Sequence, residues 1–343
     1  MGRIKKFLLK YWIFILLSLI VSILGSLYFI NKTPPKKVLP SLLSIPSPEF
    51  YNYSLKVPLN FVSLENNFPS LEKEQNAFSV ENSFFSSEEA IIMARNFGFI
   101  NEPMVYTDKT SSNIFYVWDT EADHLSINLT AGKIDYQKND SNPKNPEPST
   151  LPSLTDVEEV AKNFIKENNL LPPEKIGLVA KERYYLKATE TDFQRVSLVD
   201  EANFIEVNFQ YEINNKNLVG PEIALLIGAN SEVLRFEYEK TFKEVENIGS
   251  YPLKTKKEII ENLKNIKQIN YFNIPDYYTT PDESENIINI DLNKINLVYL
   301  KSDPRQIYLQ PIFFISGKAN LEDGRIAETG LYLPAISDEY LLK

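Results

Sequence analysis

The side chain best suited to acid–base chemistry or metal binding is also the rarest in this chain of 343 residues, which has one histidine and no cysteine. His124 belongs to the polar turn 120–124, ahead of a predicted strand. A histidine-based zinc site needs several such ligands, and a Ser-His-Asp triad needs a suitably placed serine. No G-x-S-x-G motif is present, so His124 is interpreted as an exposed turn residue. Without cysteine, disulfides, thiolate metal sites and cysteine nucleophiles are excluded.

Carboxylates are so abundant that their presence alone carries little information. The chain has 46 acidic residues, so pairs resembling a glycosidase acid and base are expected by composition. Asp282, Glu283 and Glu285 follow Pro281 and could hold calcium, but they lack the alternating D-x-D-x-D-G spacing of a specific calcium loop. A solvated loop is the favoured interpretation, and calcium stays an open alternative.

The remaining short motifs do not predict catalysis either. Ser70-x-x-Lys73 matches the first element of serine penicillin-binding enzymes, but the companion K-T-G is missing. With only 11 glycines and no G-x-x-x-x-G-K, a phosphate-binding loop is absent. We therefore predict no catalytic residue, no cofactor and no metal site, and expect that the protein is not an enzyme.

Turn glycines and aromatic residues are better explained by structure. Gly220, Gly228, Gly317 and Gly324 fall at predicted turns or strand ends, where a positive φ is useful. Six aromatic residues are interpreted as core and cross-strand pairs rather than a ligand cage. They are Tyr211, Phe236, Tyr238, Tyr308, Phe313 and Tyr332.

Charge is distributed unequally along the chain. The first 40 residues contain seven basic and no acidic side chains, so residues 41–343 contain 29 basic and 46 acidic ones, a formal charge of −17. Binding to phosphate groups needs clustered lysine and arginine. The acidic region is therefore not expected to bind nucleic acid or lie flat on a bilayer.

The segment 11–30 is predicted to be a transmembrane helix. It is 20 residues without a charge, about the length that spans a bilayer core, with aromatic residues at both ends. Basic residues precede it, so we expect a single-pass signal anchor in a bacterial cell membrane, with a cytoplasmic N-terminus and an extracytoplasmic C-terminal region. A cleaved signal peptide is the alternative. Ser18, Ser22, Gly25 and Ser26 form a small-residue face on which another helix could pack.

Composition and pattern divide the rest of the chain into segments. A proline-rich tether follows the anchor, and each later segment combines a helix with strands. The predicted divisions are a basic tail at 1–10, the membrane helix at 11–30, the tether at 31–50, and α+β units at 51–140, 150–248 and 250–337.

The same helix-then-strands pattern occurs three times. Ser86-x-x-Glu89, Thr155-x-x-Glu158 and Thr255-x-x-Glu258 are capping boxes, each opening an amphipathic helix. Alternating strands joined by short polar turns follow each helix. The predicted fold class is therefore α+β: one N-terminal transmembrane helix followed by about three helix-plus-antiparallel-sheet units.

Two later segments carry a family resemblance. Residues 218–222 and 226–236 resemble the strand–turn–strand of PepSY-like domains, as does the last unit with 308–314, Gly317 and 331–336. The layout is similar to the YycH/YycI-type regulators of Gram-positive bacteria over about residues 150–337, and more loosely over 78–140. The resemblance implies a bacterial cell-surface protein that binds another protein, such as a sensor kinase or a protease.

Three functions follow from these observations. The favoured one is a non-catalytic, membrane-anchored interaction module that presents strand edges or a helix–sheet groove to a protein or peptide. An envelope hydrolase that uses carboxylates is the second, and a structural protein of the cell envelope is the third. A deep cleft lined by two carboxylates would favour the hydrolase.

Overall fold

The computed structural model describes residues 42–43, 53–82, 84–138, 151–189, 193–240, 242–274, 286–301 and 306–342. The chain divides into two units, residues 1–40 and 41–343, and every described residue belongs to the second. The proposed helix-packing residues Ser18, Ser22, Gly25 and Ser26 lie outside the described residues, as do Asp282, Glu283 and Glu285 of the possible calcium loop.

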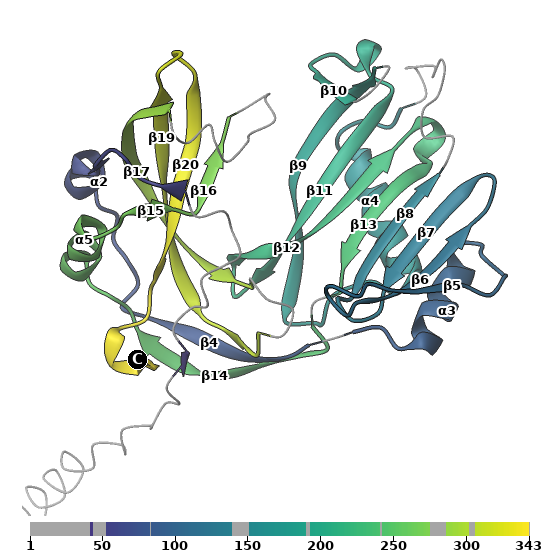
Figure 1. Ribbon diagram of the computed structural model, residues 1–343, viewed down its shortest axis with the longest axis horizontal. Coiled ribbons are helices and arrows are strands. Elements are labelled where there is room, and N and C mark those ends of the chain that lie inside the picture. The colour runs from purple at the N-terminus through teal and green to yellow at the C-terminus, as the bar shows by residue number, and fades with distance from the viewer. Residues whose placement is uncertain are drawn as a thin grey trace, which may run out of the picture. The chain divides into compact units, whose positions relative to one another are not determined.

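Helices make up a small part of the described chain (Figure 1). The α-helices are α2 (Val62–Asn66), α3 (Ser87–Asn96), α4 (Asp156–Glu167) and α5 (Lys256–Lys264). Three short 3₁₀ turns are η2 (Val199–Glu201), η3 (Ala229–Ser231) and η5 (Asp338–Tyr340).

The predicted capping boxes are confirmed at α3 and α5. The Ser86 hydroxyl accepts from the Glu89 N–H at 3.1 Å, and Glu89 in return accepts from the Ser86 N–H at 2.8 Å. Thr255 and Glu258 repeat this exchange at α5. The box predicted at Thr155 is wrong, because Thr155 is already helical and makes no cap bond. Ser153, two residues earlier, accepts from the Asp156 N–H at 3.1 Å instead.

The prediction of a single-pass membrane protein with a signal anchor is not supported by the described residues. None of the helices there is long and apolar enough to cross a membrane. The longest, α4, has 12 residues, and at about 1.5 Å per residue it reaches only about 18 Å, well short of the roughly 30 Å of a bilayer core. The predicted segment 11–30 itself lies outside the described residues. The membrane localisation is corrected on this finding and is not carried further.

Strands dominate the described chain. The first eight are β1 (Leu42–Leu43), β2 (Tyr53–Ser54), β3 (Leu59–Asn60), β4 (Glu74–Glu81), β5 (Met104–Thr107), β6 (Ile114–Asp119), β7 (Asp123–Asn128) and β8 (Lys133–Lys138). The next six are β9 (Ile176–Ala188), β10 (Phe193–Val196), β11 (Phe204–Ile213), β12 (Lys216–Ile227), β13 (Val233–Glu239) and β14 (Glu244–Pro252). The last seven are β15 (Gln268–Ile269), β16 (Tyr271–Asn273), β17 (Ile287–Leu300), β18 (Tyr308–Leu309), β19 (Pro311–Leu321), β20 (Ile326–Pro334) and β21 (Leu341–Leu342).

Fourteen of these strands form one mixed sheet. Its main path runs β16-β20-β19-β17-β12-β13-β8-β7-β6-β5, with β11, β9 and β10 branching from β12 and β3 beside β17. Neighbours are antiparallel except where β17 meets β12 and β3. The junction of β12 with β17 has only two residue pairs, Leu218 with Tyr299 and Val219 with Leu300.

Gly220 makes that junction possible. Its φ is +126°, and a Cβ there would lie 2.0 Å from the Lys301 carbonyl oxygen. Only glycine tolerates both this dihedral and this approach.

This topology contradicts the predicted fold class. Strands from all three predicted helix-plus-sheet segments join one sheet, with β8 of the first pairing β13 of the second, and β12 of the second pairing β17 of the third. A separate three-stranded sheet, β14-β4-β18, also links distant segments. The protein is mainly β, with a large mixed sheet rather than a series of helix-plus-sheet repeats, because hydrogen bonding between strands crosses the boundaries that the helix spacing had suggested.

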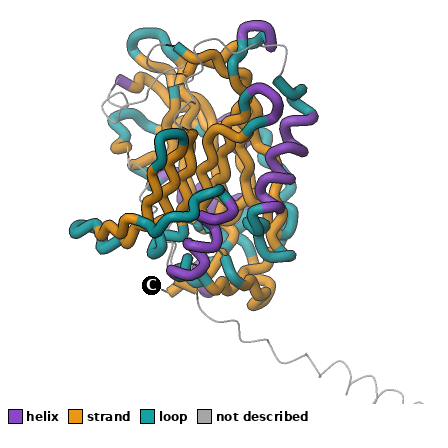
Figure 2. Tube along the Cα trace, turned by 90° about the vertical axis from the view of Figure 1, so that its right-hand side faces the viewer, coloured by secondary structure: helices purple, strands orange, loops and turns teal. Residues whose placement is uncertain are grey.

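Two main hydrophobic clusters pack the helices against the sheet, and Figure 2 shows helices lying against the strands. The first lies under α3 and α4 and includes Phe236, whose ring is 5.1 Å from that of Phe164 and 6.1 Å from that of Phe97. The second lies under α5 and α2 and includes Phe313. The burial predicted for Tyr211, Phe236, Tyr238 and Phe313 is confirmed. Tyr308 and Tyr332 are half-buried.

Candidate functional site

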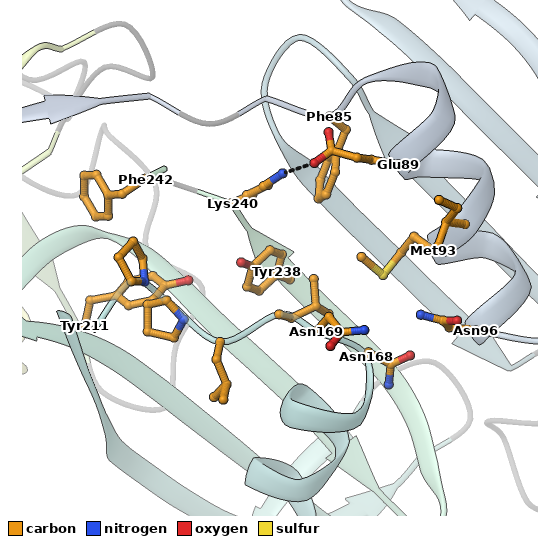
Figure 3. A pocket seen from close by; sticks show the side chains of 15 residues that line it. Phe85, Glu89, Met93, Asn96, Asn168, Asn169, Tyr211, Tyr238, Lys240 and Phe242 are labelled. Atoms are coloured by element: carbon orange, nitrogen blue, oxygen red, sulfur yellow. Dashed lines mark hydrogen bonds and ion pairs between the residues drawn. The ribbon is translucent and has the colours of Figure 1, made fainter. Parts of the chain in front are cut away.

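A groove lies between α3 and the loop 168–173 that follows α4, over strands β11 and β13. It contains a pocket of about 210 Å³ (Figure 3). Fifteen residues line it: Phe85, Glu89, Ile92, Met93, Asn96, Asn168, Asn169, Leu170, Leu171, Pro172, Pro173, Tyr211, Tyr238, Lys240 and Phe242. We call this the helix groove.

The walls of the helix groove are apolar. Met93 from α3 and Tyr238 from β13 are buried. Two large apolar side chains at the rim are instead open to solvent, since Ile92 is 51% and Leu171 is 53% exposed. Apolar surface that remains exposed beside a concavity is typical of binding sites.

An ion pair closes one side of the helix groove. Lys240 lies 3.0 Å from the Glu89 carboxylate, and its ammonium is 4.8 Å from the centre of the Phe85 ring. Figure 3 shows this pair at the N-terminal turn of α3. Partial burial acts to raise the pKa of Glu89. Hydrogen bonding to the Ser86 N–H and the contact with Lys240 together outweigh it and lower that pKa below its ordinary value.

Three amides gather away from that ion pair, from Asn96 at the end of α3 and from Asn168 and Asn169 after α4 (Figure 3). Asn168 is buried and donates to the Phe164 carbonyl at 2.8 Å. Within the described part of the chain, the side-chain amides of Asn96 and Asn169 have no hydrogen-bond partner. Each can therefore donate to and accept from a bound molecule.

The Tyr238 phenol on the floor of the helix groove remains neutral near pH 7. Burial raises the pKa of Tyr238 above its ordinary value of 10.0. The Tyr211 hydroxyl donates to the Glu239 carbonyl at 3.2 Å. The groove thus offers apolar walls, one neutral phenol and free amides, and its carboxylate is paired with Lys240.

A second, larger concavity lies elsewhere in the sheet, and we call it the cleft. It has a volume of about 860 Å³ and is lined by β12, β17, β19 and β20 together with residues 69–72. Three carboxylates line it, and each has a partner. Glu222 lies 2.7 Å from Lys181, Glu72 lies 2.8 Å from Lys216, and the Tyr271 hydroxyl donates to Glu328 at 3.4 Å.

Three aromatic rings on one wall of the cleft contact one another. The Phe314 ring lies 5.0 Å from that of Tyr332 and 5.9 Å from that of Tyr271. Burial, with nearby negative groups, raises the pKa of both Tyr271 and Tyr332 to about 12. The cleft is therefore rich in charge and rings. Its three carboxylates each have a partner, whereas Lys294 and Lys318, which also line it, form no ion pair among the described residues.

The residues singled out from sequence do not assemble into a catalytic site. His124 lies at the second position of β7 rather than in a turn, with Nδ1 2.6 Å from an Asp119 carboxylate oxygen. Ser70 lines the cleft, and no hydrogen bond joins its side chain to Lys73 in the part of the chain that the structure describes. No group of three or more His, Cys, Asp or Glu placed to hold a metal ion occurs among the described residues.

Sequence reasoning missed the helix groove. Glu89 was recognised only as a capping residue, and Lys240, Asn96 and Asn169 were not singled out. One signal could have been used: Leu170-Leu171 comes between two asparagines and two prolines, directly after a predicted helix. Two leucines in a loop need either a core or a partner to cover them.

Comparison with known proteins gives little further guidance. No protein family matches the chain, and no curated protein matches it. A solved structure of an uncharacterized protein from Eubacterium rectale is similar over 77% of this chain and 84% of that one, at 13% identity and a TM-score of 0.44. The resemblance to PepSY-like and YycH/YycI-type proteins therefore stays a prediction.

Proposed function

We propose that this protein is a non-catalytic binding module, and that the helix groove takes a large apolar side chain from a segment of a partner protein. The observation that carries the proposal is the exposed apolar rim of Ile92 and Leu171 beside a pocket with free amides. Binding energy at protein interfaces concentrates in a few anchor side chains that become buried in a pocket of the other protein. The partner's apolar side chain would be such an anchor.

Size supports a side chain rather than a free small molecule. Pockets for drug-sized ligands have volumes of about 300–1,000 Å³. The helix groove holds about 210 Å³, which is enough for one large side chain. The rest of the partner would lie over the rim, where it covers Ile92 and Leu171.

The free amides in the groove favour a peptide over a purely apolar ligand. A peptide carries an N–H and a C=O on nearly every residue, and these groups need partners when they lose water. The amides of Asn96 and Asn169 can supply both a donor and an acceptor at the rim. The ion pair of Glu89 and Lys240 adds no net charge, so the bound side chain is expected to be neutral.

Selection from a random peptide library displayed on phage, with the full chain as bait, tests the proposal. The discriminating variants are Ile92→Glu and Leu171→Glu, which place a charge on the rim without disturbing buried residues. Ile326→Glu is the matched control, because Ile326 is 50% exposed on β20, outside the groove. Glu222→Gln is the control for the cleft.

Enriched peptides should share a large apolar residue. They should bind the two rim variants about tenfold or more weakly, as expected for loss of an anchor contact, and should bind both controls like the wild type. Peptides that bind the rim variants equally well would contradict the proposal, as would a library that yields no binder. Peptides that lose affinity only for Glu222→Gln would move recognition to the cleft.

Hydrolysis by carboxylates has one observation in its favour, because three carboxylates line the cleft. Each of them accepts a bond from a lysine or a phenol, however, and so none stands alone as an acid or a base. The cleft therefore supports this function less well than the helix groove supports binding.

A further inference from the structure

The strand β5 ends the main path of the 14-stranded sheet, and its outer side pairs with no described strand. All four of its residues are exposed, including Met104 at 57%, Val105 at 63% and Tyr106 at 59%. Natural proteins usually protect such an edge with a charge, a proline or a bulge, because it is a template for another strand. The sequence Met-Val-Tyr-Thr has no charge and no proline within it.

The opposite end of the main path is shorter and more buried. There β16 has only three residues, and its central Phe272 is buried. The two ends of the main path therefore differ in exposure. β10, which ends the branch through β9, is also exposed at three of its four residues but carries the charge of Arg195. Ile100, in the segment before β5, is 86% exposed and extends the apolar surface.

A hollow of about 230 Å³ lies at the Met104 end of β5, between residues 98–102 and the end of β6. Its walls include the buried rings of Phe99 and Trp118, and two carboxylates line it, Glu102 and Asp119. Asp119 pairs with His124. Glu102 has no ion-pair partner among the described residues.

We propose that β5 accepts an extended peptide segment of a partner protein as an added strand, with a lysine or arginine of that segment in the hollow. Strand addition takes its affinity from main-chain hydrogen bonds and its specificity from pockets for alternate side chains. Apolar walls with carboxylates fit the long apolar stem and cationic end of lysine and arginine. This site is separate from the helix groove and does not depend on it.

Fluorescence anisotropy with the full chain tests this site. The probes are short labelled peptides of alternating valine and threonine, in which one lysine is moved along the sequence to sample every register. Each has a counterpart with glutamate in place of lysine. The best lysine peptide is then N-methylated on one alternate set of amides, or on the other, because a strand bonds its neighbour through one side only.

At least one lysine peptide should bind, and its glutamate counterpart should bind about tenfold or more weakly because carboxylates line the hollow. N-methylation should abolish binding for one set of amides and spare the other. The double variant Glu102→Gln with Asp119→Asn should weaken the lysine peptide about tenfold. Glu88→Gln, which removes a charge from α3, should not.

Several results would overturn the inference: no peptide binds, lysine and glutamate peptides bind equally, or both N-methylated forms bind. Analytical ultracentrifugation tests whether the edge binds a second copy of the chain instead. A dimer that the substitution Tyr106→Lys dissociates would support that assignment. The variant Leu171→Glu should bind the lysine peptide like the wild type. Failure at β5 is therefore distinguishable from failure at the helix groove.

Discussion

The helix groove and the cleft differ in the apolar surface that borders their polar groups. In the cleft, which is about four times larger, lysines and a phenol bind the three carboxylates. In the helix groove the one carboxylate is paired, but the amides of Asn96 and Asn169 are free beside exposed apolar side chains. Volume alone therefore does not identify a binding site. The exposed apolar rim is the better guide, because polar groups without a partner among the described residues line both regions. Lys294 and Lys318 are such groups in the cleft, but none of the exposed large apolar side chains lines it.

The largest expected difference is between substitutions of buried rings in the two regions, measured by the free energy of unfolding. Phe236 beneath the helix groove is fully buried and packs against the rings of Phe164 in α4 and Phe97 directly after α3, whereas Phe314 in the cleft is half-buried. We expect Phe236→Ala to lower the free energy of unfolding by about 3–5 kcal/mol, and Phe314→Ala by roughly half as much, because less apolar area is buried. Urea denaturation measures both. Equal losses would show that the cleft wall is as important to the fold as the groove floor.

Two substitutions of Asn169 should affect peptide binding and the stability of the fold to different extents. Its φ is +56°, in the left-handed region that glycine and asparagine tolerate after a helix end. We expect Asn169→Gly to keep the fold and weaken the selected peptides severalfold, because only the free amide is lost. Asn169→Ala should also lower the free energy of unfolding by about 1 kcal/mol through backbone strain. If both variants bind like the wild type, the amide is not part of the site.

Lowering the pH should slightly reduce the stability of the fold, because Glu89 becomes protonated and its ion pair with Lys240 is lost. The pKa of Glu89 is lowered in the folded protein, so its ion pair with Lys240 contributes stability above the ordinary pKa of 4.5, and that contribution is lost as pH falls through the lowered folded value. Because Glu89 is half-exposed, the expected effect is small. Thermal unfolding from pH 6 down to pH 3 should show a slightly shallower decline for Glu89→Gln than for the wild type. An identical pH profile would remove Glu89 from the set of groups that stabilise the groove.

Local signals in the sequence predicted the helices well. The capping boxes at Ser86 and Thr255 set the starts of α3 and α5, because a cap depends only on residues three positions apart. The error at Thr155 has a local cause too, since Ser153 competes for the same role. Alternation also indicates burial within a strand, as in β11, where Ile205, Val207 and Phe209 are buried.

Strand pairing and the sites could not be predicted in this way. Alternation shows which side of a strand is buried but not which strand lies beside it, so the single mixed sheet was missed. The helix groove takes Met93 from α3, Leu170 from a loop and Tyr238 from β13, three positions that no sequence period connects. The free edge at β5 likewise depends on which strands lie beside it, and no described strand pairs its outer side; alternation does not report this.

The pairing of β4 with β14 has a consequence for synthesis of the protein. Lys243 and Glu81, which form an ion pair where these strands end, are 162 residues apart in the chain. At the roughly 5–20 residues per second of a ribosome, β4 waits on the order of ten seconds or more for its partner. During that time the segment carrying Phe78 and Val80 has neither its final neighbours nor its final burial. Newly made chains are therefore expected to need a chaperone at β4 until β14 has emerged.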